Sequence, residues 1–455
     1  MSESEYDIVI LGAGSAGYAA ALRGAQLGMK IALIEADKVG GTCLHRGCIP
    51  TKALLHAAET ADAVRESAKV GITATYQGID MEALRKYRTG TVDRLHKGLQ
   101  HLIKSRKIDL VKGWGKLVSQ NTVEVDGKKY VGKNIILASG SYSKTLGLNI
   151  SERVITSDQA LELNWVPKSA IVLGGGVIGC EFASVWTSFG CEVTIIEGLP
   201  HLVANEDEAI SKGLERQFRS RGIKYELSTM FDSVAESDSG VTVKTQDGKT
   251  FSADVLLVAI GRGPATANLG YEEVGIKMDR GFVLVDENLH TGVGNIYAAG
   301  DIVPGLQLAH RGFMQGKFLA ELIAGEDTAL MPDVNIPRVT FCEPEIASVG
   351  LTEKQAKEKF GEGAVTTSEM NLAGNGKSQM LGAAGLVKLV AQKDGPIVGF
   401  HALGARLGEQ IGEGELMVNW EAYPEDVANL IHAHPTQNEA IGEAAMALAG
   451  KPLHG

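Results

Sequence analysis

Cysteine is scarce in this chain, with only five residues among 455. A secreted disulfide framework needs more cysteines at closer spacing, so their number favours a reducing, cytoplasmic compartment. The chain also lacks an excess of positive charge, because 44 Lys and Arg stand against 55 Asp and Glu for a net charge of −11. This balance argues against a general binder of nucleic acids or anionic membranes.

Long apolar runs are missing too. Glycine or a charged residue interrupts each of them before the roughly 18–20 residues that a membrane span requires. The acidic first residues, 1–5, lack the charged and apolar regions of a signal peptide. At roughly 150 residues per domain, the length predicts about three domains. A composition of 44% hydrophobic and 22% charged residues is typical of a globular protein.

Glycine, in contrast, is plentiful, and the N-terminal region arranges it in an informative order. This region reads as an apolar strand at 6–11, Gly12, Gly14 and Gly17, a helix at 18–27, a strand at 30–34, and then Glu35. The order is typical of a dinucleotide-binding unit. Gly12 would make the tight turn, Gly14 would let the backbone approach a pyrophosphate, and Gly17 would allow close packing. Glu35 would accept hydrogen bonds from a ribose.

The same pattern recurs near the middle of the chain. Its elements are a strand at 169–173, the run Gly174, Gly176, Val177, Ile178 and Gly179, a strand at 193–196, and Glu197. The acid follows the first glycine by 23 positions in both copies (35 − 12 and 197 − 174). Each copy also continues into a hairpin with an Asp-Gly turn. We infer two homologous dinucleotide domains, typically one for a flavin and one for a nicotinamide.

A close cysteine pair, Cys43 and Cys48, follows the first acid. Four residues separate the two, which suits a small disulfide loop or two metal ligands. No second paired cluster exists, and His45 alone does not complete a tetrahedral metal site, so no metal is expected. Two unreactive cysteines are the plain alternative. The position beside a flavin domain favours a redox-active disulfide, and Lys52 would help to stabilise a thiolate.

The last third has a different character from about residue 337 onward. It carries no glycine fingerprint, and it contains apolar strands at 346–349, 386–390 and 397–401 before helices in the last 45 residues. The predicted fold class is therefore α/β, with two Rossmann-like FAD/NAD(P)-binding domains and a C-terminal α+β domain. The predicted ranges are 1–145 and 266–336 for the two parts of the FAD domain, 146–265 for the NAD domain, and 337–455 for the C-terminal domain.

Several motifs together resemble one family. They are the Cys-x-x-x-x-Cys pair, the second fingerprint, Ala299-Gly300-Asp301, and His432-Ala433-His434-Pro435-Thr436. The chain is similar over nearly its whole length to the flavin-dependent pyridine nucleotide-disulfide oxidoreductases. The resemblance implies FAD at the first fingerprint, NAD at the second, and a homodimer formed by the C-terminal domain. It also implies oxidation of protein-bound dihydrolipoamide, with lipoyl domains of 2-oxoacid dehydrogenase or glycine-cleavage complexes as partners.

The resemblance also implies residue roles. Cys48 would face the flavin, Cys43 would exchange with the substrate, and His434 would be the acid/base, oriented by Glu439. The implied FAD contacts are Gly12, Gly14, Gly17, Glu35, Gly41, Thr42, Lys52, Gly115, Ser139, Gly140, Ser141, Asp301, Gln307, Leu308, Ala309 and His310. The implied nicotinamide-side contacts are Gly174, Gly176, Val177, Ile178, Gly179, Glu181, Glu197, Phe231 and Gly261.

Some alternatives stay open at this stage. Thr436 and Glu439 are spaced as a helix capping box, and Asp301 could be an ordinary helix N-cap. A glutathione- or mercury-type reductase is disfavoured, because Glu197 would repel a 2′-phosphate. A non-catalytic, redox-sensing flavoprotein subunit is the rival of another class. The basic stretch 85–107 could dock an acidic partner, although a solvated helix face is the preferred interpretation.

Departures from the family pattern put two local properties in doubt. His45 and Arg46 stand between the cysteines where Asn-Val is frequent, which bears on the potential of the thiol pair. Arg311 follows His310 where a small or apolar residue is usual, which bears on the charge beside the flavin. Ser139 replaces a common threonine and keeps its hydroxyl.

Overall fold

The computed structural model describes residues 5–454, so nearly all of the acidic segment 1–5 lies outside the described residues. Within that range, no helix is long and apolar enough to cross a membrane. The chain forms two compact units. Unit 1 comprises 1–53, 82–144 and 261–333, and unit 2 comprises 54–81, 145–260 and 334–455. The four predicted domain ranges stay predictions.

Unit 1 is built on a sheet with the strand order β3-β2-β1-β6-β5-β4, in which β19 also pairs with β6. The strands are β1 (Glu5–Leu11), β2 (Ile31–Glu35), β3 (Asp109–Lys112), β4 (Gly115–Ser119), β5 (Thr122–Val125), β6 (Lys128–Leu137) and β19 (Ile296–Ala298). β1 runs parallel to both β2 and β6. Its apolar residues are buried from Ile8 to Leu11, as expected for a central strand covered on both faces.

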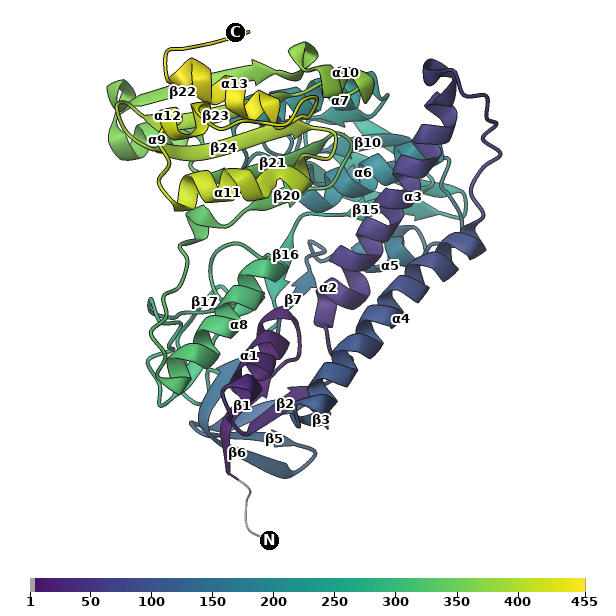
Figure 1. The fold of residues 1–455 in the computed structure, drawn as a ribbon. Coiled ribbons are helices and arrows are strands. Elements are labelled where there is room, and N and C mark those ends of the chain that lie inside the picture. Colours follow the sequence, from purple (N-terminus) through teal and green to yellow (C-terminus); the bar gives the residue numbers. More distant parts are fainter. Residues whose placement is uncertain (1–4, 455) are drawn as a thin grey trace. The chain divides into compact units, whose positions relative to one another are not determined.

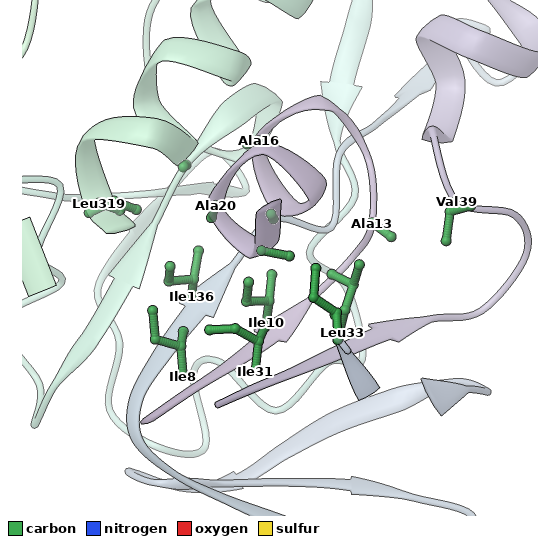
Figure 2. Packing of buried hydrophobic residues seen from close by; sticks show 14 of the residues in the cluster. Ile8, Ile10, Ala13, Ala16, Ala20, Ile31, Leu33, Val39, Ile136 and Leu319 are labelled. Atoms are coloured by element: carbon green, nitrogen blue, oxygen red, sulfur yellow. The ribbon is translucent and has the colours of Figure 1, made fainter. Parts of the chain in front are cut away.

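Two helices, α1 (Ser15–Gln26) and α8 (Ala309–Ala324), lie side by side in unit 1 (Figure 1). Small residues permit the close approach, because a Cβ on Gly316 would stand 2.1 Å from the carbonyl oxygen of Ala16. Figure 2 shows side chains of α1 packed over the sheet: Ala16 and Ala20 from the helix, with Ile8, Ile10, Ile31, Leu33 and Ile136 from the strands. This core fixes the start of α1 at the end of β1.

The remaining elements of unit 1 include the segments that carry the cysteines. They are α2 (Gly41–Arg46), the start of α3 (Cys48–Glu66), α4 (Met81–Ser105), β7 (Ser141–Ser143), β16 (Arg262–Pro264), β17 (Met278–Asp279), β18 (Phe282–Val283) and the 3-10 turn η2 (Gly300–Ile302). Most of the basic stretch 85–107 is exposed, as predicted. The prediction is wrong at Arg88, which is buried on the same helix face as Leu84 and Val92.

Unit 2 repeats the nucleotide-binding topology. Its parallel sheet has the order β11-β10-β9-β15-β8, and a separate antiparallel sheet has the order β12-β13-β14. The elements are β8 (Val154–Ile155), α5 (Ser157–Glu162), β9 (Ser169–Leu173), α6 (Val177–Phe189), β10 (Glu192–Ile196), α7 (Glu208–Ser220), β11 (Lys224–Glu226), β12 (Phe231–Ser237), β13 (Gly240–Thr245), β14 (Thr250–Ala253) and β15 (Val255–Val258). The order β11-β10-β9-β15 matches β3-β2-β1-β6 of unit 1, as the sequence repeat predicts.

The C-terminal part of unit 2 is an antiparallel sheet with helices, and its predicted strands are confirmed. The sheet order is β20-β21-β24-β23-β22. The elements are η3 (Asp333–Asn335), β20 (Arg338–Thr340), β21 (Glu345–Gly350), α9 (Glu353–Phe360), β22 (Val365–Asn371), α10 (Gly376–Met380), β23 (Leu386–Gln392), β24 (Ile397–Gly404), α11 (Ile411–Asn419), α12 (Pro424–Ala428) and α13 (Glu439–Leu448). The buried Lys388 Nζ lies 2.9 Å from Asp207 Oδ1 and 2.6 Å from Glu353 Oε2, linking β23 to the starts of α7 and α9.

The carboxyl group of Glu345, on β21, predicts a pH dependence of stability. Burial raises its pKa to about 7, although the N–H of Gly408 donates to Oε2 at 2.8 Å. Between the ordinary carboxyl pKa and about 7, the folded state binds more protons than the unfolded state, so stability falls as pH rises through this window. Glu345→Gln, which stays neutral and keeps an acceptor oxygen, is expected to stabilise the protein at pH 8 by about 1 kcal/mol or more.

Thermal or denaturant unfolding at pH 5 and pH 8 would measure this effect. The exposed Glu358→Gln variant is the matched control and should show no such pH-dependent gain. Equal stabilisation of Glu345→Gln at both pH values would contradict the proposed ionisation of a partly buried carboxyl group.

Candidate active site

The first glycine turn has the geometry that a phosphate-binding backbone requires. Gly12 has φ = 103°, and a Cβ there would lie 2.2 Å from the carbonyl oxygen of Ala138. A Cβ on Gly17 would lie 1.8 Å from the oxygen of Gly12, so helix and strand meet without room for a side chain. No atom stands within 4 Å of the corresponding Gly14 position, which leaves open space at the start of α1. A helix N-terminus with such space suits a pyrophosphate.

Glu35 is held at the end of β2, beside this turn. Its Oε2 accepts from the N–H of Ala13 at 2.7 Å, and its Oε1 accepts from the N–H of Asp37 at 2.9 Å. Each carboxylate oxygen can accept a second hydrogen bond, so a ribose diol can still bind. The two backbone hydrogen bonds therefore orient the carboxylate and leave it able to accept further hydrogen bonds.

The second turn copies this arrangement. Gly174 has φ = 105°, and a Cβ on Gly179 would lie 1.9 Å from the oxygen of Gly174. Glu197 follows β10 and accepts from the N–H of Gly175 at 2.5 Å and from that of Leu199 at 2.8 Å. The acids of the two units are thus fixed by equivalent neighbours, namely the second residue of the fingerprint and the residue two positions after the acid.

Cys43 and Cys48 lie next to each other as thiols, one within α2 and the other at the start of α3. A hydrogen bond with Cys48, followed by burial, raises the pKa of the Cys43 thiol, while the charge of Lys52 acts in the opposite direction. The helix that carries Cys43 touches the phosphate turn, because a Cβ on Gly41 would stand 2.7 Å from the Cα of Gly14. The thiol pair therefore lies beside the first nucleotide turn.

The two unusual residues between the cysteines have partners of their own. The guanidinium group of Arg46 pairs with Asp37 at 2.5 Å, on the exposed surface. The Nε2 atom of His45 lies 2.9 Å from the carbonyl oxygen of Val39, and its ring makes an edge contact with His96. Arg311, the third departure, is buried and pairs with Asp333 at 2.7 Å, so its charge is neutralised within unit 1.

A second group of predicted residues converges in unit 1. Ser141 donates a hydrogen bond to Asp301 Oδ2, and the Nε2 atom of Gln307 donates to the carbonyl oxygen of Asp301 at 3.3 Å. Asp301 belongs to the turn η2, and the alternative that it caps α8 does not hold, because α8 begins at Ala309. Gly115 opens β4, and Leu308, Ala309 and the exposed His310 lie at the start of α8.

Several residues of this neighbourhood escaped the sequence interpretation. Arg262 donates through Nε to Ser141 Oγ at 2.7 Å, and the hydroxyl of Tyr271 donates to Ser139 Oγ at 3.0 Å. Gln315, on α8, accepts from the N–H of Gly300 at 2.8 Å. Tyr18 lies near both thiols, and burial together with Cys43 and Cys48 raises its pKa to about 12. Tyr18 and Arg262 directly follow the predicted site residues Gly17 and Gly261, whereas Tyr271 and Gln315 have no such signal in the sequence.

His434 and Glu439 form a hydrogen-bonded pair in unit 2. His434 Nδ1 lies 2.8 Å from Glu439 Oε1, while Glu439 Oε2 accepts from the N–H of Thr436 at 2.8 Å. These two bonds lower the pKa of Glu439, that of Thr436 contributing most. Glu439 thus binds His434 and the backbone of Thr436 with one oxygen each. The alternative capping box is not formed, because α13 begins at Glu439 with Asn438 as its N-cap and the Thr436 hydroxyl donates to the carbonyl oxygen of Ala433 at 2.7 Å. The imidazole of His434 is 81% exposed, whereas His432 is largely buried and pairs with Glu413.

The remaining predicted site residues lie on helices, strands and turns of unit 1 or unit 2. Thr42 and Lys52 lie on α2 and α3. Gly176, Val177 and Ile178 open α6, and the buried Glu181 of the same helix accepts from the N–H of Phe341 at 3.0 Å. Phe231 begins β12, and Gly261 has φ = 105° just after β15. Among the described residues, no group of three or more His, Cys, Asp or Glu could hold a metal ion.

These features define a class of protein, and the comparisons agree. Residues 6–316 match the pyridine nucleotide-disulphide oxidoreductase family, and residues 336–445 match its dimerisation domain. The chain therefore belongs to this family, whose members use FAD and NAD. The predicted fold class and cofactors are confirmed.

Individual relatives and solved structures show which members of the family the chain is similar to. The chain is 40% identical to a dihydrolipoyl dehydrogenase of Bacillus subtilis, over 99% of this chain and 98% of the relative. It is 39% identical to the mitochondrial dihydrolipoyl dehydrogenase of Pisum sativum, over 99% and 93%. Among solved structures, LpdA from Mycobacterium tuberculosis aligns with a TM-score of 0.90 at 26% identity, over 98% and 99% of the two chains. The HOCl-induced flavoprotein disulfide reductase RclA from Escherichia coli aligns with 0.87 at 26% identity, over 98% and 99%.

Glu197 is predicted to set the choice of nicotinamide. A carboxylate fixed by two backbone N–H groups accepts from the ribose diol of NAD and repels a 2′-phosphate. Glu197→Ala is expected to raise KM for NAD about tenfold or more and to improve the relative use of NADP. Steady-state kinetics with both nucleotides would measure this change.

Two further variants make this test specific. Glu197→Gln removes the charge but keeps an oxygen for Gly175, so it separates repulsion from support of the turn. Glu192→Ala removes a highly exposed carboxylate on β10 and should leave the NAD/NADP ratio unchanged. A wild-type enzyme that already uses NADP as well as NAD would contradict the assignment.

Proposed function

We propose that this chain is an NAD-dependent dihydrolipoyl dehydrogenase, which oxidises protein-bound dihydrolipoamide to lipoamide. The observation that carries the proposal is the contact between the cysteine-bearing helix and the phosphate turn, at Gly41 and Gly14. It sets a redox-capable thiol pair beside the turn to which we assign FAD. The full-length similarity to dihydrolipoyl dehydrogenases adds support.

The residues fit the two nucleotides. The open position at Gly14, the oriented Glu35, and the network of Ser141 with Asp301 would hold FAD. The second turn and Glu197 would hold NAD. When bound, FAD supplies a two-electron oxidation of the cysteine dithiol, with NAD as the final acceptor.

The protein side chains carry out the thiol chemistry. His434 takes a proton from one substrate thiol, and the resulting thiolate attacks Cys43 Sγ of the Cys43–Cys48 disulfide. The sulfur–sulfur bond of the protein breaks, a mixed disulfide forms, and Cys48 leaves as a thiolate. The second substrate thiol then attacks the substrate sulfur of the mixed disulfide. This closes the lipoyl ring and releases Cys43 as a thiol, so one disulfide is exchanged for another.

Glu439 acts on this proton transfer through His434. With Nδ1–H donated to the carboxylate, Nε2 is the nitrogen that accepts the substrate proton. The lowered pKa of Glu439 keeps the carboxylate ionised well into the acid range, so the imidazole keeps its orientation whenever it is neutral and able to accept a proton.

We further propose that the enzyme works as a homodimer in the cytoplasm and that its substrate is carried on a lipoyl domain. The match to a dimerisation domain supports the dimer, and the few scattered cysteines favour a reducing compartment. A disulfide reductase with another substrate is the alternative in the same class, because RclA also shares the fold.

The deciding experiment is the formation of NADH from NAD and free dihydrolipoamide. We expect turnover with dihydrolipoamide. In the reverse direction, we expect a much lower rate of NADH oxidation with glutathione disulfide or with Hg²⁺ as the electron acceptor. A purified, flavin-loaded protein that produces no NADH from dihydrolipoamide, but oxidises NADH with another disulfide, would refute the proposal. Oxidation of dihydrolipoamide carried on a lipoyl domain should give the same result.

A further inference from the structure

Two large apolar side chains are exposed at equivalent points of the two nucleotide units. Trp114 is 65% exposed in unit 1, and Met230 is 55% exposed in unit 2. Each is the last residue before the strand that opens the antiparallel part of its unit, namely Gly115 of β4 and Phe231 of β12. Neither side chain belongs to a core cluster of its unit. Each therefore presents an accessible apolar surface at the same point of its unit.

Backbone hydrogen bonds show that the two positions correspond. The N–H of Gly113 donates to the carbonyl oxygen of Glu35 at 2.9 Å, and the N–H of Thr229 donates to that of Glu197 at 2.9 Å. Trp114 and Met230 are the next residues along the chain. In both units, the exposed apolar residue thus follows the one that is tied to the ribose-binding acid.

The side chain of Met230 lies directly beside this acid. A Cβ on Gly198, the residue after Glu197, would stand only 2.8 Å from the Met230 sulfur. The thioether therefore covers the backbone next to the carboxylate. In unit 1, the residue that follows Trp114 lies over the ends of β1 and β2, because a Cβ on Gly115 would meet Leu11 and Ile34.

We propose that Trp114 and Met230 are adenine-covering residues, one for each nucleotide. The carboxylate fixes the ribose, and the adenine attached to that ribose extends over the adjacent apolar side chain. An indole stacks on a base through its flat face, and a polarisable thioether packs against an aromatic ring. Neither residue touches the reacting atoms, so each contributes binding affinity for its own cofactor.

The test uses crossed substitutions with two probes. FAD binding to apoprotein, followed by flavin fluorescence, reports on unit 1, and ADP-ribose binding to FAD-loaded enzyme reports on unit 2. Trp114→Ala is expected to weaken FAD binding about tenfold, whereas Trp114→Phe retains most of the affinity because a flat ring remains. Met230→Ala should weaken ADP-ribose binding about threefold, and Met230→Leu should be close to wild type.

Testing each variant with the probe for the other unit separates loss of a local contact from a general loss of structure. Trp114→Ala should leave ADP-ribose affinity unchanged, and Met230→Ala should leave FAD affinity unchanged, with circular dichroism of each apoprotein as a check of folding. Wild-type FAD affinity in Trp114→Ala, or an equal loss in Trp114→Phe, would overturn the assignment in unit 1. Wild-type ADP-ribose affinity in Met230→Ala, or a loss of FAD affinity as large as its loss of ADP-ribose affinity, would overturn it in unit 2.

Discussion

Replacement of Cys43 or Cys48 by serine is expected to abolish NADH formation from dihydrolipoamide, with a loss of about 10⁴-fold or more in kcat. A hydroxyl group is nearly isosteric with the thiol, so the fold should persist, but neither variant can form the disulfide that the substrate attacks. Reduction of an artificial dye by NADH needs no cysteine and should remain within about tenfold of wild type. Stopped-flow and steady-state assays of both reactions would measure the difference.

A matched control removes a cysteine that the mechanism does not use. Cys191 is buried in unit 2, where burial raises the pKa of its thiol to about 12. Cys191→Ala should keep both activities. A Cys43→Ser enzyme that retains dihydrolipoamide turnover would remove the basis of the proposed mechanism, whereas loss of dye reduction as well would indicate a defect in flavin binding.

Local spacing made the two nucleotide turns predictable from the sequence. A tight turn requires a glycine at Gly12 because φ is positive, and close helix–strand packing requires one at Gly17. These constraints involve residues that are close in sequence, and so does the distance to Glu35. The same holds for the pair of His434 and Glu439, which are five residues apart.

Long-range contacts were beyond the reach of sequence patterns. Arg262 reaches Ser141 across 121 positions, and Tyr271 reaches Ser139 across 132. The local sequence around Arg262 and Tyr271 does not indicate either of these partners, and it does not indicate that Tyr271 is fully buried. Arg88 is a different case, since its spacing of four from Leu84 and Val92 places it on the buried stripe of α4. At this position the helical periodicity of the apolar residues predicts burial correctly, whereas the positive charge wrongly indicates exposure.

The exposure of His434 is consistent with a site completed by a second subunit. Its imidazole is 81% exposed, although a general base works best where water is excluded. The family resemblance implies that the C-terminal domain closes the thiol pocket of the other subunit of a two-fold dimer. His434→Gln alone is then expected to lower kcat by a factor of about 10² to 10⁴, as for other general bases.

Mixing two inactive variants tests whether the site is shared. Cys43→Ser and His434→Gln chains, unfolded and refolded together with FAD, should yield heterodimers in which one site has both an intact thiol pair and an intact His434. At equal amounts, about half of the dimers are mixed, with one working site in each, so activity should recover to roughly a quarter of wild type. If His434 acted within its own chain, every site in a heterodimer would lack one group. A mixture as inactive as its parents, with heterodimers demonstrated by tags on the two chains, would therefore assign His434 to the thiol pair of its own subunit.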